Sequence, residues 1–252
     1  MSIPLQESTI QEIPVQRLTP ETPVREIVLE MPSAIPLLEK LGIDYCCGGA
    51  RSLAAACDEK GLELAAVLEE LAGLRRQQAP AQELWRTAPL PDLIRHVVEH
   101  HHAFARQQME MILPLAEKVA KRHGSKHPDL PVIAERLSAL SAELTHHFAC
   151  EENILFPAIV RLDAGHSPLF PPVFGNIRQP IERMLRDHDQ TGEELRTLRA
   201  MTDDLQPPEE ACFSWRALYR AMAELESDLH QHIHLENNIL FPRAQQRVQG
   251  AA

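Results

Sequence analysis

Two histidine–glutamate pairs recur in this chain and together could bind metal ions. The segments HFACEENILFPAI and HIHLENNILFPRA begin at His147 and His232, and each carries a glutamate four residues later, at Glu151 and Glu236. Residues four apart in an α-helix lie on the same face, one turn above each other. Each pair can therefore offer an imidazole and a carboxylate to a common site.

The interval between the pairs indicates a duplicated helical hairpin. Both the histidines and the glutamates are 85 positions apart, from His147 to His232 and from Glu151 to Glu236. Single histidines repeat at nearly the same interval, one within the run HHH at 100–102 and one at His188. Periodicity alone allows either His101 or His102 to face inward. Such a duplication would bring two metal-binding half-sites together.

Burial of these acids favours bound cations. Apolar residues at helical spacing surround both pairs, so the ionisable groups interrupt stripes that face a core. These stripes contain Leu140, Leu144, Leu155 and Ala158 around the first pair, and Leu218, Met222, Leu225, Leu229 and Leu240 around the second. A buried carboxylate without a partner costs several kcal/mol, which metal ions would offset. We therefore predict two ions, each with two histidines and both bridged by the glutamates.

The donor types narrow the choice of metal without fixing it. Imidazole and carboxylate suit iron, manganese or zinc, and the general affinity order favours zinc over iron(II). A ferritin-like carboxylate site would use Glu-x-x-His at a spacing of three. This chain has the opposite order and a longer step, so it does not fit that pattern.

The elements that must position these residues are four long helices. Helical patterns cover about 91–123, 129–162, 176–202 and 209–246, and segments rich in proline and turn formers separate them. Aromatic content is only 4%, and strand-like alternation is absent. The predicted fold class is all-α, with an up-and-down four-helix bundle over 91–246.

A smaller helical domain is predicted before the bundle. It covers 22–76, follows a tail over 1–21, and is joined to the bundle by a linker over 77–90. Thr22 is its expected first N-cap, with Pro23 at the first helical position, and Gly42 and Gly61 are expected C-terminal caps.

This domain carries adjacent cysteines, Cys46 and Cys47, followed by two glycines and Arg51. Glycine permits a tight turn, and a helix N-terminus with a nearby arginine would lower a thiol pKa. The pattern predicts two accessible, reactive or metal-accepting thiols, and the alternative is a packed turn of two small residues. Cys57, Cys150 and Cys212 lie in helical patterns and are expected to be inert.

Composition excludes several classes of partner. The chain has 252 residues and a formal net charge of -11, which disfavours binding to nucleic acid or to an anionic membrane surface. No apolar stretch is long enough to span a bilayer, and the start lacks a basic and then apolar segment. Five cysteines do not fit a secreted disulfide framework. A cytoplasmic protein is therefore predicted.

Outer contacts to the metal ligands are harder to predict. Glu143 and Asp228 each precede a ligand histidine by four residues, so we predict that they support the site from outside. The other histidines are expected at the surface or in such outer positions; they are His96, His123, His127, His146, His166, His230 and His234.

These motifs resemble the RIC (repair of iron centres) family of di-iron proteins over about 22–246. The similarity is carried by DYCCGG, the single histidines at His102 and His188, HFACEENILFP and HIHLENNILFP. It implies a hemerythrin-like bundle and selects His102 from the HHH run. It also implies two Fe ions in a non-haem, oxo-bridged centre, with Glu151 and Glu236 as bridges.

The resemblance further implies repair of iron–sulfur clusters damaged by nitric oxide or oxidants, through donation of iron. Damaged iron–sulfur proteins would then be the partners, and a homodimer is left open. The alternatives are a di-iron reductase of nitric oxide or peroxide, and a sensor that binds O2 or NO. An oxygen carrier of the hemerythrin type would be expected to use more histidines than this ligand set has.

Overall fold

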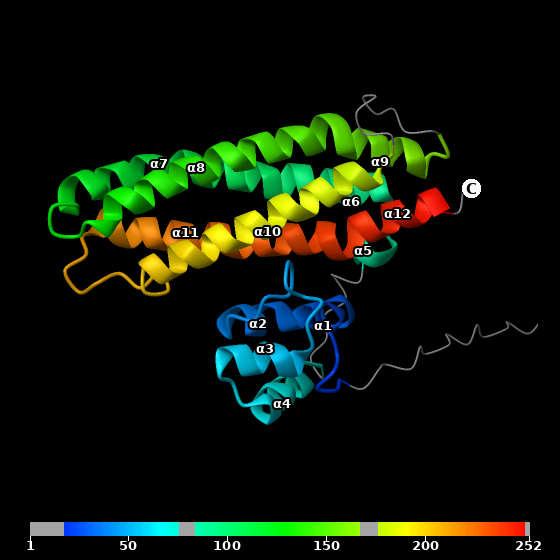
Figure 1. Cartoon of the computed structure of the whole chain (residues 1–252), viewed down its shortest axis with the longest axis horizontal. Helices are drawn as coiled ribbons and strands as arrows, with labels where there is room; N and C mark the ends of the chain where they lie inside the picture. The colour runs from blue at the N-terminus through cyan, green and yellow to red at the C-terminus, as the bar shows by residue number, and fades with distance from the viewer. Residues whose placement is uncertain (1–17, 76–83, 167–175, 250–252) are drawn as a thin grey trace, which may run out of the picture.

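The computed structural model describes residues 18–75, 84–166 and 176–249, and the regular elements within these ranges are helices joined by turns (Figure 1). Within these ranges there is no strand, only an isolated β-bridge between Pro23 and Ser52. The predicted all-α class is therefore confirmed. Most of the predicted tail and part of the predicted linker lie outside the described residues. None of the described helices is long and apolar enough to cross a membrane.

Four long helical rods run side by side in Figure 1 and form the bundle. The first contains α6 (Leu90–His96), the π-helix η2 (Val97–His102) and α7 (Ala103–His123). The second contains α8 (Asp129–Cys150), the π-helix η3 (Glu151–Leu155) and α9 (Phe156–Asp163). The third is α10 (Arg178–Met201), and the fourth contains α11 (Phe213–Leu235), the π-helix η4 (Glu236–Leu240) and α12 (Phe241–Gln249). A short helix, α5 (Leu84–Thr87), precedes the first rod.

The four predicted helical ranges agree with these bounds to within four residues. The largest difference is at the start of α11, predicted at 209 and observed at Phe213. Cys212 is extended there, with φ -73° and ψ 169°, so the helix begins only after it.

The three π-helical segments were not predicted, and each contains a predicted ligand. In η3 and η4 the N–H of the following phenylalanine bonds to the carbonyl of the glutamate five residues earlier, from Phe156 to Glu151 and from Phe241 to Glu236. Proline follows each phenylalanine, has no N–H to donate, and crowds the carbonyl four residues before it. A wider turn removes that conflict, and π turns of this kind are frequent at functional sites.

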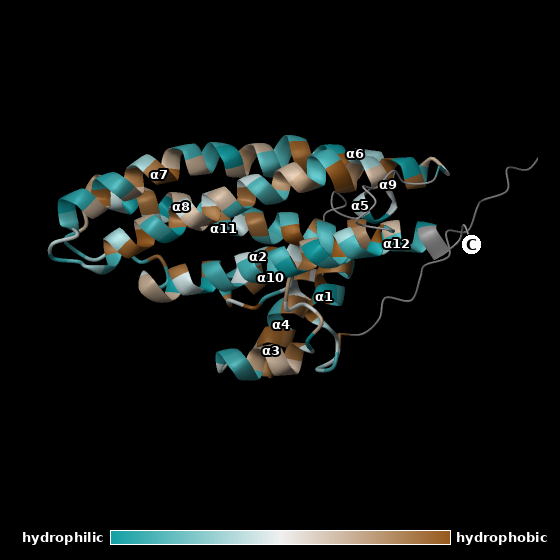
Figure 2. Ribbon diagram, turned by 45° about the horizontal axis from the view of Figure 1, so that its top comes forward, coloured by the Kyte–Doolittle hydropathy of each residue, from teal (hydrophilic) through white to brown (hydrophobic). Residues whose placement is uncertain are grey.

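The bundle buries its apolar residues in two clusters. One fills the end of the bundle formed by α7, α8, α10 and α11, and the other fills the end formed by α6, α9 and α12. Brown and teal residues alternate along the long helices in Figure 2, as expected for helices with one buried face. The predicted ligands lie between the two clusters.

The small domain contains α1 (Val24–Glu30), the 3-10 helix η1 (Pro32–Ala34), α2 (Ile35–Lys40), α3 (Leu53–Lys60) and α4 (Leu64–Arg75). Its core also includes Ile233 of α11, so the domain packs on the bundle. The Thr22 cap prediction is wrong, because Pro23 is the N-cap and the Thr22 hydroxyl accepts from the Thr19 N–H. Gly42 and Gly61 follow helices with φ of 65° and 64°, which confirms them as terminating residues.

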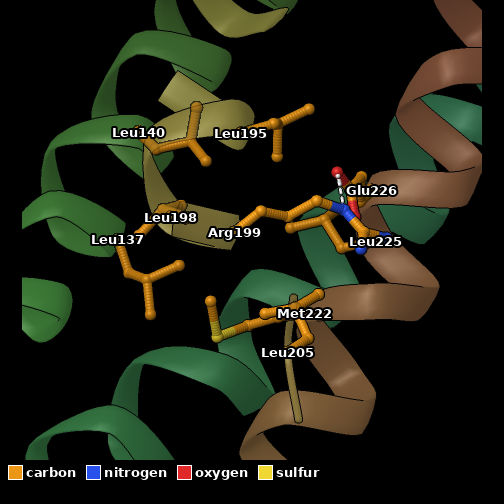
Figure 3. A pocket seen from close by; sticks show the side chains of 9 residues that line it. All are labelled: Leu137, Leu140, Leu195, Leu198, Arg199, Leu205, Met222, Leu225 and Glu226. Carbon is orange, nitrogen blue, oxygen red and sulfur yellow. Dashed lines mark hydrogen bonds and ion pairs between the residues drawn. The ribbon is translucent and has the colours of Figure 1, made fainter. Parts of the chain in front are cut away.

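A charged pair lies beside a small apolar cavity between α8, α10 and α11 (Figure 3). Arg199 donates from Nε to both carboxylate oxygens of Glu226 at 2.8 Å. The Glu226 side chain is only 6% exposed, whereas that of Arg199 is 39% exposed. Leucines such as Leu140 and Leu225 line the rest of the cavity, whose volume is about 10 Å³.

Arg199→Ala should lower the free energy of unfolding by about 2 kcal/mol, because it leaves the buried Glu226 carboxylate without its partner. This value is below the usual cost of breaking a buried pair, since Arg199 is more than a third exposed. Urea denaturation of the purified variant would measure it. Arg220, 82% exposed and paired with Glu224, is the control, and Arg220→Ala should change stability by less than about 0.5 kcal/mol. Equal effects of the two substitutions on stability would contradict the conclusion that Arg199 offsets the burial of the Glu226 carboxylate.

Candidate metal centre

The structure brings all six predicted ligands together in the interior of the bundle. Two sets of four side chains have donor atoms within 4.8 Å of one another, and Glu151 and Glu236 belong to both. The first set adds His102 and His232, and the second adds His147 and His188. All six residues are buried. The choice of His102 over His101 agrees with this geometry, because His101 belongs to neither set.

Distances between the donor atoms fit a pair of ions. The Nε2 atoms of His102 and His232 are 3.3 Å apart, and those of His147 and His188 are 3.0 Å apart. Two ligand atoms that each lie about 2.1 Å from an ion, at a right angle, are about 3.0 Å apart. Each half of the cluster therefore has room for one ion between its imidazoles.

The two glutamates are placed to bridge the halves. Glu151 directs Oε2 toward His102 and Oε1 toward His147, each at 3.3 Å. Glu236 directs Oε1 toward His232 and Oε2 toward His188, each at 3.1 Å. Each carboxylate thus presents one oxygen to each half-site.

The buried carboxylates lack hydrogen-bond partners within the part of the chain that the structure describes. None of the four oxygens of Glu151 and Glu236 accepts a hydrogen bond from a described residue, although histidine ring nitrogens lie 3.1–3.3 Å away. The imidazole nitrogens lie close to the carboxylate oxygens but do not form hydrogen bonds with them, and in each set these atoms surround a common point. Buried anionic oxygens without donors are costly, so the donor set fits cations at those points.

The acids and imidazoles of the site shift one another's pKa values. Burial by itself would raise the pKa of Glu236, but the imidazoles of His232 and His188 hold it well below its usual value. Burial would likewise lower the pKa of His147, but Glu151 and Asp187 outweigh it and raise that pKa to about 10. A cation entering the site must therefore displace a proton from His147.

Two outer contacts orient ligand histidines from equivalent positions. His102 donates from Nδ1 to Glu152 Oε1 at 2.7 Å, and Arg106 donates to the same oxygen at 2.7 Å. His188 donates from Nδ1 to Asn237 Oδ1 at 2.7 Å. Such bonds leave Nε2 free for an ion. Glu152 and Asn237 directly follow the bridging glutamates, 85 positions apart, which is the signal that could have revealed them.

The remaining outer contacts differ between the halves. Asp187 Oδ2 lies 3.5 Å from His147 Nδ1. His101 lies 86 positions before Asp187, the same interval that relates His102 to His188, so it occupies the equivalent position in the other half. Its ring stacks on the ring of His232 with centres 5.8 Å apart. The Nδ1 of His101 bonds to Asp228 at 2.9 Å. The duplicated hairpins therefore surround their ligands differently.

The prediction for Glu143 is wrong, because its side chain is exposed and Leu144 faces the core in its place. Asp228 contacts His101 and not His232, so its support of the site stays a prediction. Six of the other histidines are exposed or half-buried, as expected. His234 is the exception, since it is buried and packs edge-on against Tyr45 with ring centres 5.7 Å apart.

The adjacent cysteines lie against the metal-binding bundle. Cys47 is half-buried and its thiol donates to the carbonyl oxygen of His188 at 3.4 Å. Asp44 Oδ1 accepts the N–H groups of both Cys46 and Cys47 at 3.0 Å, and the two sulfurs are 3.9 Å apart. We call residues 44–48 the cysteine turn.

The predicted accessibility of both thiols is wrong for Cys46, which is buried. Its pKa is raised well above the usual value, first by the contact with Cys47 and then by burial. The predicted lowering of the pKa does not hold for Cys46, because Arg51 pairs with Glu59 and α3 begins only at Leu53, beyond the cysteine turn. Cys57 is buried, Cys150 is half-buried and Cys212 is exposed.

A cleft of about 940 Å³ is lined by the cysteine turn and α2 on one side and by α10 and α11 on the other. Asp44 and Cys47 line one side, and Gly192 and Arg196 line the other. Its volume is that of a small-molecule binding site, and both cysteines border it.

Comparison with known proteins agrees with the two-part architecture. Residues 92–244 match the hemerythrin HHE cation-binding domain, and residues 20–75 match a domain of unknown function, DUF542. The chain is 39% identical over 225 residues to the iron-sulfur cluster repair protein YtfE of Citrobacter koseri, covering 89% of this chain and 96% of that protein. It is 38% identical, with the same coverage, to the protein of that name from Escherichia coli O157:H7.

Proposed function

This chain belongs to the family of iron–sulfur cluster repair proteins with a hemerythrin HHE domain, and from this premise we propose that it repairs damaged clusters by donating iron from a non-haem, oxo-bridged di-iron centre. Its partners are then proteins that carry damaged iron–sulfur clusters. The observation that carries the proposal is the pair of buried half-sites that share Glu151 and Glu236.

The proposed ligands are divided between the two ion positions. His102 and His232 hold one ion, His147 and His188 hold the other, and the two glutamates span both. When bound, the pair of ions supplies the iron that a damaged cluster has lost. The protein contributes a water-poor interior in which Glu152 and Asn237 keep imidazole rings turned toward the ions.

The cysteine turn is proposed to assist transfer or docking. It lies between the cleft and the backbone of His188, so it is close to one half-site and also borders an open volume. Cys46 and Cys47 line the cleft and no proposed ligand histidine does, so a segment of a damaged cluster protein bound there would contact the turn.

The test is to incubate iron-loaded protein with an iron–sulfur dehydratase inactivated by nitric oxide. Donation predicts that dehydratase activity returns while protein-bound iron falls by a matching amount. The zinc-loaded protein is the matched control and should restore nothing. If nitric oxide or peroxide is consumed catalytically while all iron stays bound, the protein is a di-iron reductase and the donation proposal fails. Reversible O2 or NO binding without repair would indicate a sensor.

A further inference from the structure

We infer that the two ion positions are inequivalent, and that the ion held by His147 and His188 is released first, under control of the cysteine turn. This inference rests on the proposed di-iron site. It adds to that site an order of release and the residues that set it.

The half-site of His102 and His232 is closed by rings and a charged contact. The His102 ring stacks on Phe148 with centres 4.1 Å apart and planes 14° apart, and the residue is 0% exposed. Its partner Glu152 is itself held by Arg106, and bonds between charged groups are stronger than neutral ones. The ring of His101 covers His232 from the side. The Nδ1 of His232 has no hydrogen-bond partner among the described residues, so His102 is the firmly oriented ligand of this half.

The half-site of His147 and His188 is held less firmly. His147 is 6% exposed, the most exposed of the six proposed ligands. The Nδ1 of His147 has no hydrogen-bond partner among the described residues, because Asp187 lies 3.5 Å away outside hydrogen-bond geometry. His188 relies on the neutral amide of Asn237. The ligands of this half therefore reorient at lower cost.

Among the described contacts, the cysteine turn bonds to one proposed ligand, His188 of this half, and to no ligand of the other half. Cys47 bonds to the carbonyl of His188, and Asn237 Nδ2 donates to the carbonyl of Cys46 at 3.5 Å. Asn237 therefore joins the turn to the Nδ1 of His188 through a single amide group. Its equivalent, Glu152, bonds to Arg106 instead. Displacing the turn would loosen His188 and leave His102 unaffected.

Release of iron(II) to a phenanthroline-type chelator, followed by absorbance, tests the order. The reduced, iron-loaded protein should lose one ion per chain in a fast phase and one in a slow phase. Asn237→Ala should accelerate the fast phase about tenfold and leave the slow phase unchanged. Glu152→Ala, the matched variant of the other half, should accelerate the slow phase and leave the fast phase unchanged. A single phase in the parent protein, or a fast phase that responds to Glu152→Ala and not to Asn237→Ala, would overturn the inference.

A second pair of variants tests the turn itself. Cys47→Ala removes the bond to the His188 carbonyl and should accelerate the fast phase by about two- to tenfold. Cys47→Ser keeps a donor at that place and should behave like the parent protein. Cys212→Ala, in an exposed cysteine outside the turn, should also leave both phases unchanged. An unchanged fast phase in Cys47→Ala would show that the cysteine turn does not control release of the first ion.

The outcomes separate this inference from the proposed function. If the two phases respond as expected but the released iron restores no damaged cluster, donation fails and the order of release stands. If repair proceeds and both ions leave together, the inference fails and donation stands.

Discussion

Replacement of Glu236 with alanine should reduce the bound iron from two ions per chain to fewer than one. Each half-site takes one Glu236 oxygen, so the substitution removes a ligand from both positions at once. Loss of an outer contact already costs about 10- to 100-fold in metal affinity, and loss of a shared ligand should cost more. Metal analysis after gel filtration, at equal protein concentration, would measure the change.

Glu226 provides the matched control for this experiment. It is a second buried glutamate on the same rod, but it pairs with Arg199 and belongs to neither ligand set. Glu226→Gln should therefore keep two ions per chain. If the Glu236 variant also kept two ions with an unchanged absorption spectrum, the bridging role of this carboxylate would be refuted.

Removal of both ions should lower the stability of the protein, by an amount that grows as the pH rises from 6.5 to 9. Each ion that binds only the folded chain stabilises it by about 4 kcal/mol when present at a thousand times its dissociation constant. The pH dependence follows from His147, whose pKa in the folded, metal-free protein is raised to about 10 from the ordinary 6.5. Its proton competes with the ion for the same imidazole.

The sign of this effect follows from the direction of the shift. A raised pKa stabilises the metal-free fold fully below pH 6.5, and that stabilisation is lost as the pH rises toward 10. Over the same range the ion displaces the proton more easily, so binding tightens by up to about 1.4 kcal/mol per pH unit. Thermal unfolding with and without chelator, at pH 6.5, 7.5 and 8.5, would show the difference widening. A difference that stayed constant or narrowed would contradict the proton competition at His147.

The sequence was sufficient to predict the helices and the assembly of the ligands. The i to i+4 pairs and their common interval depend on local geometry and on duplication, and both are readable from residue spacing. His188 could be placed because it lies on an apolar stripe with Ile181 and Met184, which are both buried. The HHH run could not be resolved by period, because η2 departs from the regular helical turn at those residues.

The features that were missed depend on tertiary contacts. Asn237 and Glu152 bond to histidines on other rods, so the interval of 85 positions could single them out as a pair but could not give their partners. Glu143 was expected at the site because it lies one turn from His147, yet a small rotation around α8 carries it into solvent. Cys46 is buried in the core of the small domain, to which Ile233 of the bundle also contributes.

Each of the two shared glutamates presents one oxygen to each half-site, and this has a consequence for a protein that is proposed to donate metal. After the first ion is released, Glu151 and Glu236 would each still coordinate the remaining ion through their other oxygen. The half-loaded chain would then keep its interior acids partly neutralised and its rods assembled. A donor of this kind would stay folded after it releases one ion, and it could bind a new ion without refolding.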